Sequence, residues 1–368
     1  MFREIIRSAV CSVVIVMTSS SLLNAQETNG DSQDKDELLV RGLSLELPVS
    51  ELLDAEARKA HERAAIEASK FDCPGFRYPF IDEKSILIYR SCEERFFRPL
   101  IAKIRKNHKV DISQKLIAGV DTEIIIPADG IPQKNKKRVL INLHGGAFAV
   151  GGGPEKEGLV ESIAVAAIGK IKIISVDYRM YPEHVFPAAT DDVVTVYREL
   201  LKSYQPENIG IYGCSAGGLL TAQTVVRLQY EGIPKPGAIG MLCAAAIRSG
   251  GGDSKELLAL VNGKVERPKS VSYFKNENED NQLISPGKYP EILKQFPPSL
   301  LVSSTRDAAL SKVVYTHSQL VKFGVDTELH VYEGLGHGGF LNPQLPEFNE
   351  VHNVIVKFFD KHLGNRGN

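Results

Sequence analysis

The chain has 368 residues, of which 43% are hydrophobic and 24% are charged, and its formal net charge is -1. This length allows one large domain with an insertion, or two domains, and the composition is ordinary for a soluble globular protein. A charge so close to zero gives no electrostatic reason to expect a nucleic acid or an anionic membrane as the partner.

The N-terminus has the three-part pattern of a secretory signal. Arg3 and Arg7 precede an apolar run at 9–17, and small residues follow up to Ala25. The apolar run has nine residues, whereas a membrane-spanning helix needs about 20. We therefore predict a signal peptide at 1–25, export to the periplasm or out of the cell, and no membrane span after the signal is removed.

Four cysteines lie beyond the predicted signal. Cys73 and Cys92 are in the N-terminal region, where an oxidising compartment would permit a disulfide, but the sequence does not decide whether it forms. Cys214 and Cys243 fall in strand-like segments and are predicted to be buried thiols. The spacing of cysteine and histidine does not fit a metal site, so we predict no metal.

Two helical segments precede the first predicted strand. Apolar residues recur at helical spacing from Pro48 to about Lys70, and a second helical stretch covers 93–107. Because both segments come before any strand, residues 26–110 are predicted to form an N-terminal helical cap.

From about Lys115 onwards, predicted strands and helices alternate. The strands are predicted at 124–126, 139–143, 172–176, 209–212, 239–245, 300–302 and 327–332, and the helices at 157–168, 188–204, 216–230, 311–323 and up to 363. Such alternation predicts an α/β fold with a mostly parallel central sheet covered by helices on both faces. Residues 111–368 are therefore the predicted core domain, with an irregular insertion at 247–296 that contributes to the cap.

A G-x-S-x-G pentapeptide at 213–217 lies between a predicted strand and a predicted helix. A serine at such a turn is held in a strained backbone conformation that exposes its hydroxyl, which makes Ser215 the candidate nucleophile. By itself, the pentapeptide fits a turn of small residues equally well.

A serine nucleophile needs a histidine base and a carboxylate that orients the base. In this type of sheet the chain order is serine, acid, histidine, and functional groups follow the C-terminal ends of strands. Of the histidines after Ser215, only His337 directly follows a predicted strand. Asp307 follows the strand at 300–302, although an N-cap of the next helix is an alternative role for it.

The strand at 139–143 ends at His144-Gly145-Gly146. Glycine there lets backbone N–H groups approach a tetrahedral intermediate, so Gly145 and Gly146, with Ala216, are the predicted oxyanion-hole donors. His144 precedes Ser215 in the chain and is interpreted as a structural residue that hydrogen-bonds within its loop.

These motifs together resemble the hormone-sensitive-lipase-like esterases of the α/β-hydrolase superfamily. The similarity covers about residues 115–363, and its motifs are HGGAF at 144–148, DYRMYPE at 177–183, FPA at 186–188, GCSAGG at 213–218, TRD at 305–307 and GH at 336–337. Three positions depart from the family pattern: Cys214 where aspartate is frequent, Ala147 where a third glycine is usual, and Ala308 where proline is frequent.

The resemblance implies an α/β-hydrolase fold and a serine carboxylic ester hydrolase that needs no cofactor. The family usually favours short acyl chains, and the stretches at 305–310 and 331–334 are similar to bacterial ε-lactone hydrolases, which implies a small or cyclic ester. An amidase or peptidase with the same triad stays open, as does a non-catalytic ligand-binding protein on the same fold. The predicted partner is a small-molecule ester, and the oligomeric state, a homodimer included, is open.

Overall fold

The computed structural model describes residues 47–74, 82–248, 252–261, 272–275 and 277–364. The predicted signal peptide at 1–25 lies outside the described residues, as does part of the insertion predicted at 247–296. Within the described ranges, no helix is both long enough and apolar enough to cross a membrane.

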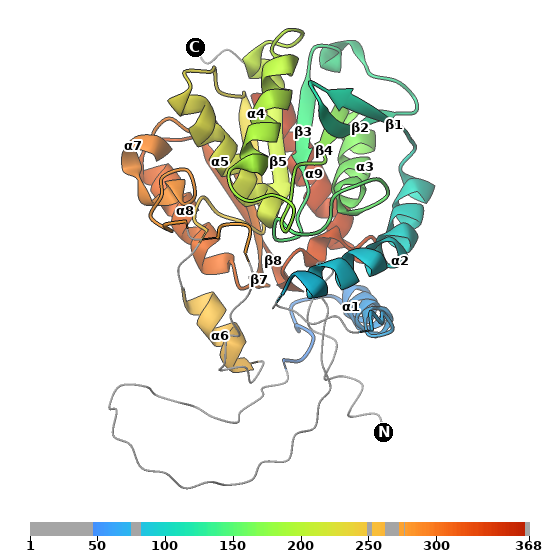
Figure 1. Cartoon of the computed structure of the whole chain (residues 1–368). Helices are drawn as coiled ribbons and strands as arrows, with labels where there is room; N and C mark the ends of the chain where they lie inside the picture. Colours follow the sequence, from blue (N-terminus) through green and yellow to red (C-terminus); the bar gives the residue numbers. More distant parts are fainter. Residues whose placement is uncertain (1–46, 75–81, 249–251, 262–271, 276, 365–368) are drawn as a thin grey trace, which may run out of the picture.

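An eight-stranded sheet forms the centre of the molecule (Figure 1), in the order β1-β2-β4-β3-β5-β6-β7-β8. The strands are β1 (Val110–Ile117), β2 (Val120–Pro127), β3 (Val139–Leu143), β4 (Lys172–Val176), β5 (Ile209–Cys214), β6 (Ala238–Leu242), β7 (Ser299–Arg306) and β8 (Thr327–Gly336). The six strands from β4 to β8 in this order are parallel, whereas β1 pairs antiparallel with β2 and β2 antiparallel with β4. The predicted mostly parallel sheet is confirmed.

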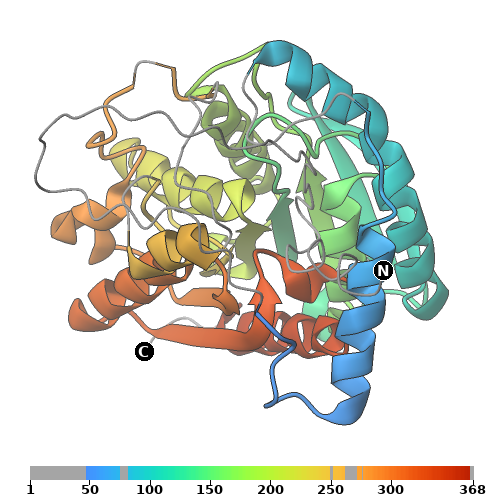
Figure 2. The same ribbon diagram turned by 90° about the horizontal axis from the view of Figure 1, so that it is seen from below.

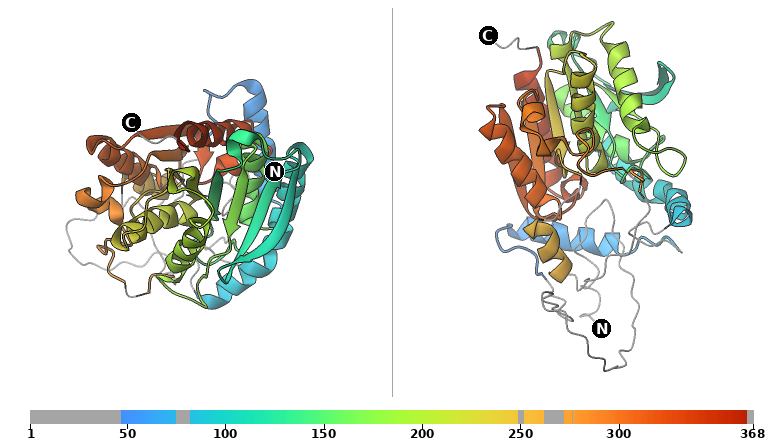
Figure 3. Two further views of the ribbon diagram at one scale, coloured as in Figure 1. Left: turned by 90° about the horizontal axis from the view of Figure 1, so that it is seen from above. Right: turned by 60° about the vertical axis from the view of Figure 1, so that its left-hand side comes forward.

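Helices cover both faces of the sheet, as the view from above in Figure 3 shows. The helices on one face are α3 (Glu157–Gly169) and α9 (Glu347–His362), and those on the other are α4 (Ala188–Leu200), α5 (Ala216–Tyr230) and α8 (Leu310–Lys322). Side chains alternate along each strand, so Leu140 packs in the apolar layer with α3 and α9, and Ile141 in the layer with α4 and α5. The sheet therefore separates two apolar cores.

Three further helices lie at the edge where the parallel strands end, which Figure 2 shows from below. They are α1 (Ala55–Ala68), α2 (Glu83–Asn107) and α6 (Asp253–Val261). Arg90 of α2 donates to the carbonyl oxygens of Ala149 and Tyr181 at 2.8 and 2.7 Å, which ties α2 to the core loops. A disulfide joins Cys73 to Cys92 of α2, a pairing that the sequence left open.

Several predicted boundaries differ from the structure. The helix predicted at 93–107 begins at Glu83, where Asp82 and Ser85 form a capping box. β1 was missed because only its first and last residues are buried, so its sequence lacks apolar alternation. The insertion predicted to be irregular contains α6 and also α7 (Pro290–Leu293).

Candidate active site

The site is built around the sharp turn between β5 and α5. Ser215 occupies this turn with φ 54° and ψ -115°, a conformation that costs a non-glycine residue on the order of 1–3 kcal/mol. A Cβ atom on Gly213 or Gly217 would lie 2.1 or 1.7 Å from the carbonyl oxygen of Leu143. Glycine at both positions is therefore what lets β5 and α5 pack so closely against β3 with Ser215 between them.

The three residues predicted as nucleophile, base and acid form one hydrogen-bonded chain. His337 Nε2 is 2.8 Å from Ser215 Oγ, and His337 Nδ1 is 2.8 Å from Asp307 Oδ1. β7 and β8 extend beyond their predicted ends to Arg306 and Gly336, so Asp307 and His337 each follow their strand directly. Because the Asp307 carboxylate accepts, Nδ1 carries the ring proton and Nε2 is free to accept the proton of Ser215.

The environment of Asp307 keeps its carboxyl group ionised. Burial raises the pKa of Asp307, but the charge and hydrogen bond of His337 lower it, as do the N–H of Ala309 and the hydroxyl of Ser303, and the net direction is downward. The N–H of Ala309, the residue just before α8, donates to Asp307. Asp307 therefore bonds the main chain at the start of α8 in the manner of an N-cap residue and contacts His337 at the same time.

The pKa of His337 moves in the opposite direction. Burial lowers this pKa, but the charge and hydrogen bond of Asp307 raise it, and the net result lies above the ordinary value of a histidine. The His337 side chain is 35% exposed, whereas that of Asp307 is 0% exposed. The base can therefore meet a ligand from solvent while its orienting carboxylate cannot.

In the loop after β3, one of the N–H groups predicted to form the oxyanion hole is already bonded within the protein. The N–H of Gly145 donates to Glu161 Oε1 at 3.1 Å, so it points toward α3 and is not available to a bound substrate. The prediction that Gly145 forms part of an oxyanion hole was therefore wrong.

Three other N–H groups remain as candidate donors. Those of Gly146 and Ala147 have no hydrogen-bond partner within the described part of the chain, and that of Ala216 opens α5, where first-turn N–H groups have no partner inside the helix. Gly146 and Ala147 have φ +95° and +57°, and a Cβ atom on Gly146 would lie 2.1 Å from the carbonyl oxygen of Val150. The tight turn thus requires glycine at 146 and tolerates alanine at 147.

Sequence analysis missed a buried glutamate that joins the two halves of the site. Glu161 of α3 is 1% exposed, and its Oε1 accepts the N–H of Gly145. Its Oε2 accepts the N–H of Cys214 at 3.2 Å and the amide of Asn142 at 2.9 Å. Glu161 therefore links the oxyanion loop to the nucleophile turn. The available signal was a single acid inside the apolar run at 159–168, since such a group is buried only where it is hydrogen-bonded.

Two more buried glutamates lie behind the same loop. Glu93 of α2 accepts the N–H of Gly151 at 2.6 Å and lies 3.1 Å from the ammonium of Lys156. Glu157, one turn before Glu161, is also buried. Burial raises the pKa of Glu157 well above its ordinary value, and the charges of Glu161 and Glu93 also raise it. Burial likewise raises the pKa of Glu161 to about 8, although the hydrogen bonds from Asn142, Gly145 and Cys214 lower it.

Metal-ligand side chains gather at one place within the described ranges. Ligand atoms of Cys243, Asp307 and His337 lie within 4.8 Å of one another. Cys243 Sγ accepts the N–H of Gly338 at 3.0 Å, and Asp307 is bonded to His337. These contacts give all three side chains a partner within the protein. Cys214 and Cys243 are buried free thiols, as predicted.

A comparison with family models identifies the core. Residues 140–341 match the model of a family described as alpha/beta hydrolase fold. The match covers more than half of the chain and includes Ser215, Asp307 and His337. The chain belongs to this α/β-hydrolase family.

Relatives of this α/β hydrolase include named esterases. It is 33% identical over 124 residues to the versiconal hemiacetal acetate esterase of Emericella nidulans, which is 34% of this chain and 41% of the relative. It is 39% identical over 109 residues to the esterase LipU of Mycobacterium tuberculosis, which is 29% of this chain and 34% of the relative. The chain thus spans about two fifths or less of the length of these curated relatives.

Solved structures match over most of the chain. The crystal structure of esterase E25 is 28% identical, with a TM-score of 0.75 over 89% of this chain and 100% of that one. An esterase from the bacterial hormone-sensitive lipase family is 26% identical, with a TM-score of 0.66 over 75% of this chain and 92% of that one. The resemblance to hormone-sensitive-lipase-like esterases that the motifs indicated is confirmed.

Proposed function

We propose that this α/β hydrolase is a serine carboxylic ester hydrolase. The observation that carries the proposal is the hydrogen-bonded chain from Ser215 through His337 to Asp307, in which each ring nitrogen of the base has its partner at 2.8 Å. The names of the related esterases support the same class of reaction. The proposed reaction needs no cofactor.

In the proposed mechanism, Ser215 Oγ attacks the ester carbonyl carbon while its proton passes to His337 Nε2. The N–H groups of Gly146, Ala147 and Ala216 stabilise the resulting oxyanion. His337 then gives the proton to the leaving alcohol oxygen as the carbon–oxygen bond breaks, and the acyl group stays on Ser215. A water molecule then attacks the acyl carbon and loses a proton to His337. His337 returns this proton to Ser215 Oγ as the bond from Oγ to the acyl carbon breaks, and the carboxylic acid leaves.

The proposed substrate is a short-acyl or cyclic ester. Two observations support this choice: the stretches at 305–310 and 331–334 that resemble ε-lactone hydrolases, and a relative that is named an acetate esterase. An amidase or peptidase would use the same triad and differ in the leaving group, so the test includes an anilide.

We also propose that the protein is exported to the periplasm or secreted. The N-terminal pattern at 1–25 supports this, and so does the Cys73–Cys92 disulfide, since such bonds persist in oxidising compartments. Fractionation of cells that express the full chain tests this proposal. The mass of the exported protein is expected to correspond to a chain cleaved after Ala25. Full-length protein retained in the cytoplasm would refute the proposal.

The test of the activity is hydrolysis of p-nitrophenyl esters from acetate to laurate, with the Ser215→Ala variant. We expect rapid turnover of the short esters and a loss on the order of 10⁴-fold or more in the variant. Ser318→Ala is the matched control, because Ser318 is exposed on α8 and donates only to the carbonyl oxygen of Val314. Folded protein that turns over p-nitroanilides but no ester would favour the amidase. A protein that binds esters but turns over neither class would be a binding protein.

A further inference from the structure

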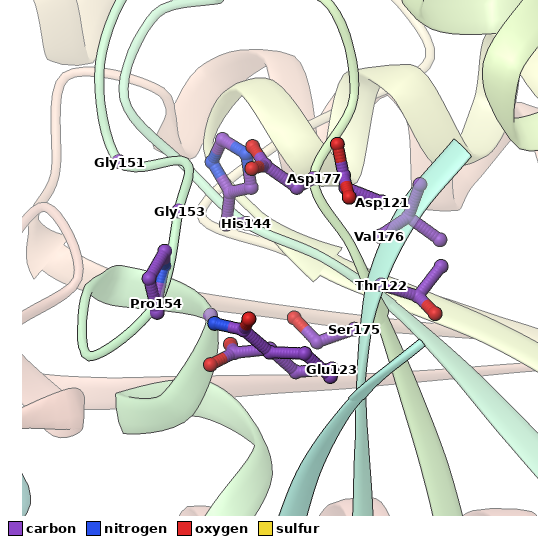
Figure 4. A pocket seen from close by; sticks show the side chains of 12 residues that line it. Asp121, Thr122, Glu123, His144, Gly151, Gly153, Pro154, Ser175, Val176 and Asp177 are labelled. Atoms are coloured by element: carbon purple, nitrogen blue, oxygen red, sulfur yellow. The ribbon is translucent and has the colours of Figure 1, made fainter. Parts of the chain in front are cut away.

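A cavity of about 240 Å³ lies over the ends of β2 and β4 (Figure 4). Ser215, Asp307 and His337 are not among the residues that line it. At a liquid volume of about 30 Å³ per water, the space holds an organic molecule of several heavy atoms. The cavity is therefore distinct from the triad and large enough for a ligand.

Carboxylates from two paired strands face this cavity. Glu123 of β2 lies opposite Ser175 of β4, and the N–H of Asp177 donates to the carbonyl oxygen of Asp121 at 3.0 Å. Since side chains alternate along a strand, these four residues share one face of the sheet. Figure 4 shows them around the cavity.

His144 adds an acceptor that has no partner. The residue is 2% exposed, and its Nδ1 is 2.8 Å from the carbonyl oxygen of Gly145, so Nδ1 carries the proton. Its Nε2 is left as a bare lone pair without a hydrogen-bond partner within the described part of the chain. The ring of Tyr178 stacks on that of His144 at 4.1 Å and 6°, which fixes the orientation of the imidazole.

The nearby donors are already used within the protein. The hydroxyl of Ser175 donates to Asn142 Oδ1 at 3.1 Å, and that of Thr122 donates to the carbonyl oxygen of Lys115 at 2.5 Å. The N–H of Gly151 donates to Glu93. Two main-chain N–H groups already donate to the cavity carboxylates, that of Gly153 to Asp177 and that of Glu155 to Glu123. Apart from the amide of Gln114, which is exposed on β1, the lining polar side chains offer a ligand mainly acceptors.

The charge in the cavity is also unbalanced. Burial, together with the charges of Asp177 and Glu155, raises the pKa of Glu123 to about 7, although a hydrogen bond from the main chain of Glu155 lowers it. Burial and the charge of Asp121 raise the pKa of Asp177 as well, although the charges of Lys156 and Arg90 and a hydrogen bond from the main chain of Gly153 lower it. The nearby ammonium of Lys156 is paired with Glu93 at 3.1 Å. The carboxylates around the cavity still outnumber these donors and cations, and His144 Nε2 has no donor among the described residues, so the lining favours a cationic ligand that carries N–H groups.

We propose that this cavity binds a small organic cation with N–H donors, such as an alkylammonium or a guanidinium compound. Its N–H groups donate to the carboxylates of Asp121 and Asp177 and to Nε2 of His144. A bare metal ion fits less well, because within the described ranges these side chains do not bring three ligand atoms within 4.8 Å of one another. The site is additional to the proposed esterase activity and does not depend on it.

A chain of hydrogen bonds connects the cavity to the nucleophile turn. Ser175 donates to Asn142, Asn142 donates to Glu161, and Glu161 accepts the N–H of Cys214. Occupation of the cavity should therefore change the kcat of ester hydrolysis. This second part rests on the proposed function, whereas binding itself is measured without any ester.

Calorimetric titration of the mature chain tests the binding. Ethanolamine and methylguanidinium are the probes, and choline, which has the same charge but no N–H on its nitrogen, is the matched negative ligand. We expect ethanolamine or methylguanidinium to bind with a Kd of about 1 mM or tighter, and choline at least about tenfold more weakly.

Asp121→Asn is expected to weaken this binding about fivefold or more, because an amide replaces a charged acceptor. Asp111→Asn is the matched control, since Asp111 is exposed on β1 and does not line the cavity. Three outcomes would overturn the proposal. Choline could bind as tightly as ethanolamine, Asp121→Asn could have the same Kd as the unmodified protein, or Mg²⁺ or Ca²⁺ could bind in place of both organic probes. The absence of binding by both probes would also overturn it, and none of these outcomes bears on ester hydrolysis.

Discussion

The two sides of the loop at 144–154 differ in whether their polar side chains have hydrogen-bond partners. On the Ser215 side, both ring nitrogens of His337 and both oxygens of Asp307 have hydrogen-bond partners. On the other side, His144 Nε2 has no hydrogen-bond partner among the residues that the structure describes, and carboxylates face a cavity. A fully matched network holds atoms in one geometry, which proton transfer requires, whereas unmatched acceptors suit the recognition of a donor from outside.

Glu161 lies between these two sides and contacts both. Its carboxylate holds the main chain of the oxyanion loop and that of the nucleophile turn, and it accepts from Asn142, which in turn accepts from Ser175 at the cavity. The side with the triad has hydrogen-bond partners for the polar side-chain atoms of His337 and Asp307, whereas His144 Nε2 on the cavity side has none among the described residues. This difference predicts that mutations lower kcat by graded amounts, with the largest losses at the triad.

The largest effect is expected for Asp307→Asn. The amide cannot hold His337 in the tautomer that leaves Nε2 free, so kcat should fall on the order of 10⁴-fold. Steady-state kinetics on a short p-nitrophenyl ester measure this, with Asp326→Asn, an exposed acid before β8, as the control. A loss below tenfold would show that Asp307 does not orient the base.

Glu161→Gln should lower kcat on the order of 10²-fold with little change in KM, because an amide nitrogen faces at least one of the N–H groups that Glu161 now accepts. Glu157→Gln is the control, since Glu157 lies one turn earlier on the same buried helix and its Oε1 has no hydrogen-bond partner among the described residues. Equal losses in the two variants would mean that the effect is general to the buried helix face and not specific to the link between the two loops.

The pH dependence of kcat/KM reports directly on His337 and its hydrogen bond to Asp307. His337 must be neutral to accept a proton, and Asp307 raises its pKa above that of an ordinary histidine, so kcat/KM should fall about tenfold per pH unit once the pH drops below this raised pKa. In Asp307→Asn the residual activity should titrate at lower pH, because burial then lowers the pKa of His337 without opposition. An unshifted acid limb in that variant would argue against Asp307 as the cause.

The smallest effect is expected for Ser303→Ala. The hydroxyl of Ser303 donates to Asp307 Oδ2 at 3.0 Å, and loss of one such hydrogen bond of about 1 kcal/mol corresponds to about fivefold in kcat/KM. Ser299→Ala on the same strand is the control, because Ser299 donates to the carbonyl oxygen of Pro297, away from the site. If both variants match the unmodified protein, the carboxylate does not need this donor.

Much of the fold could be predicted because its signals are local. The bounds of β3, β4 and α5 agree with prediction to the residue, since short apolar runs and flanking glycines mark them. β1 and residues 83–92 of α2 could not be found in this way, because an exposed edge strand and a half-exposed helix carry little apolar periodicity.

The sequence by itself determined the order Ser215, Asp307, His337 and the strand ends that carry them. Only the tertiary structure decided which N–H groups are free, since Gly145 is bonded to a glutamate 16 residues away and Cys214 to the same glutamate 53 residues away. The pairing of Cys73 with Cys92 and the cavity beside His144 were decided in the same way. The physical reason is that propensity and periodicity act between neighbours in the chain, whereas hydrogen-bond partners are chosen by packing.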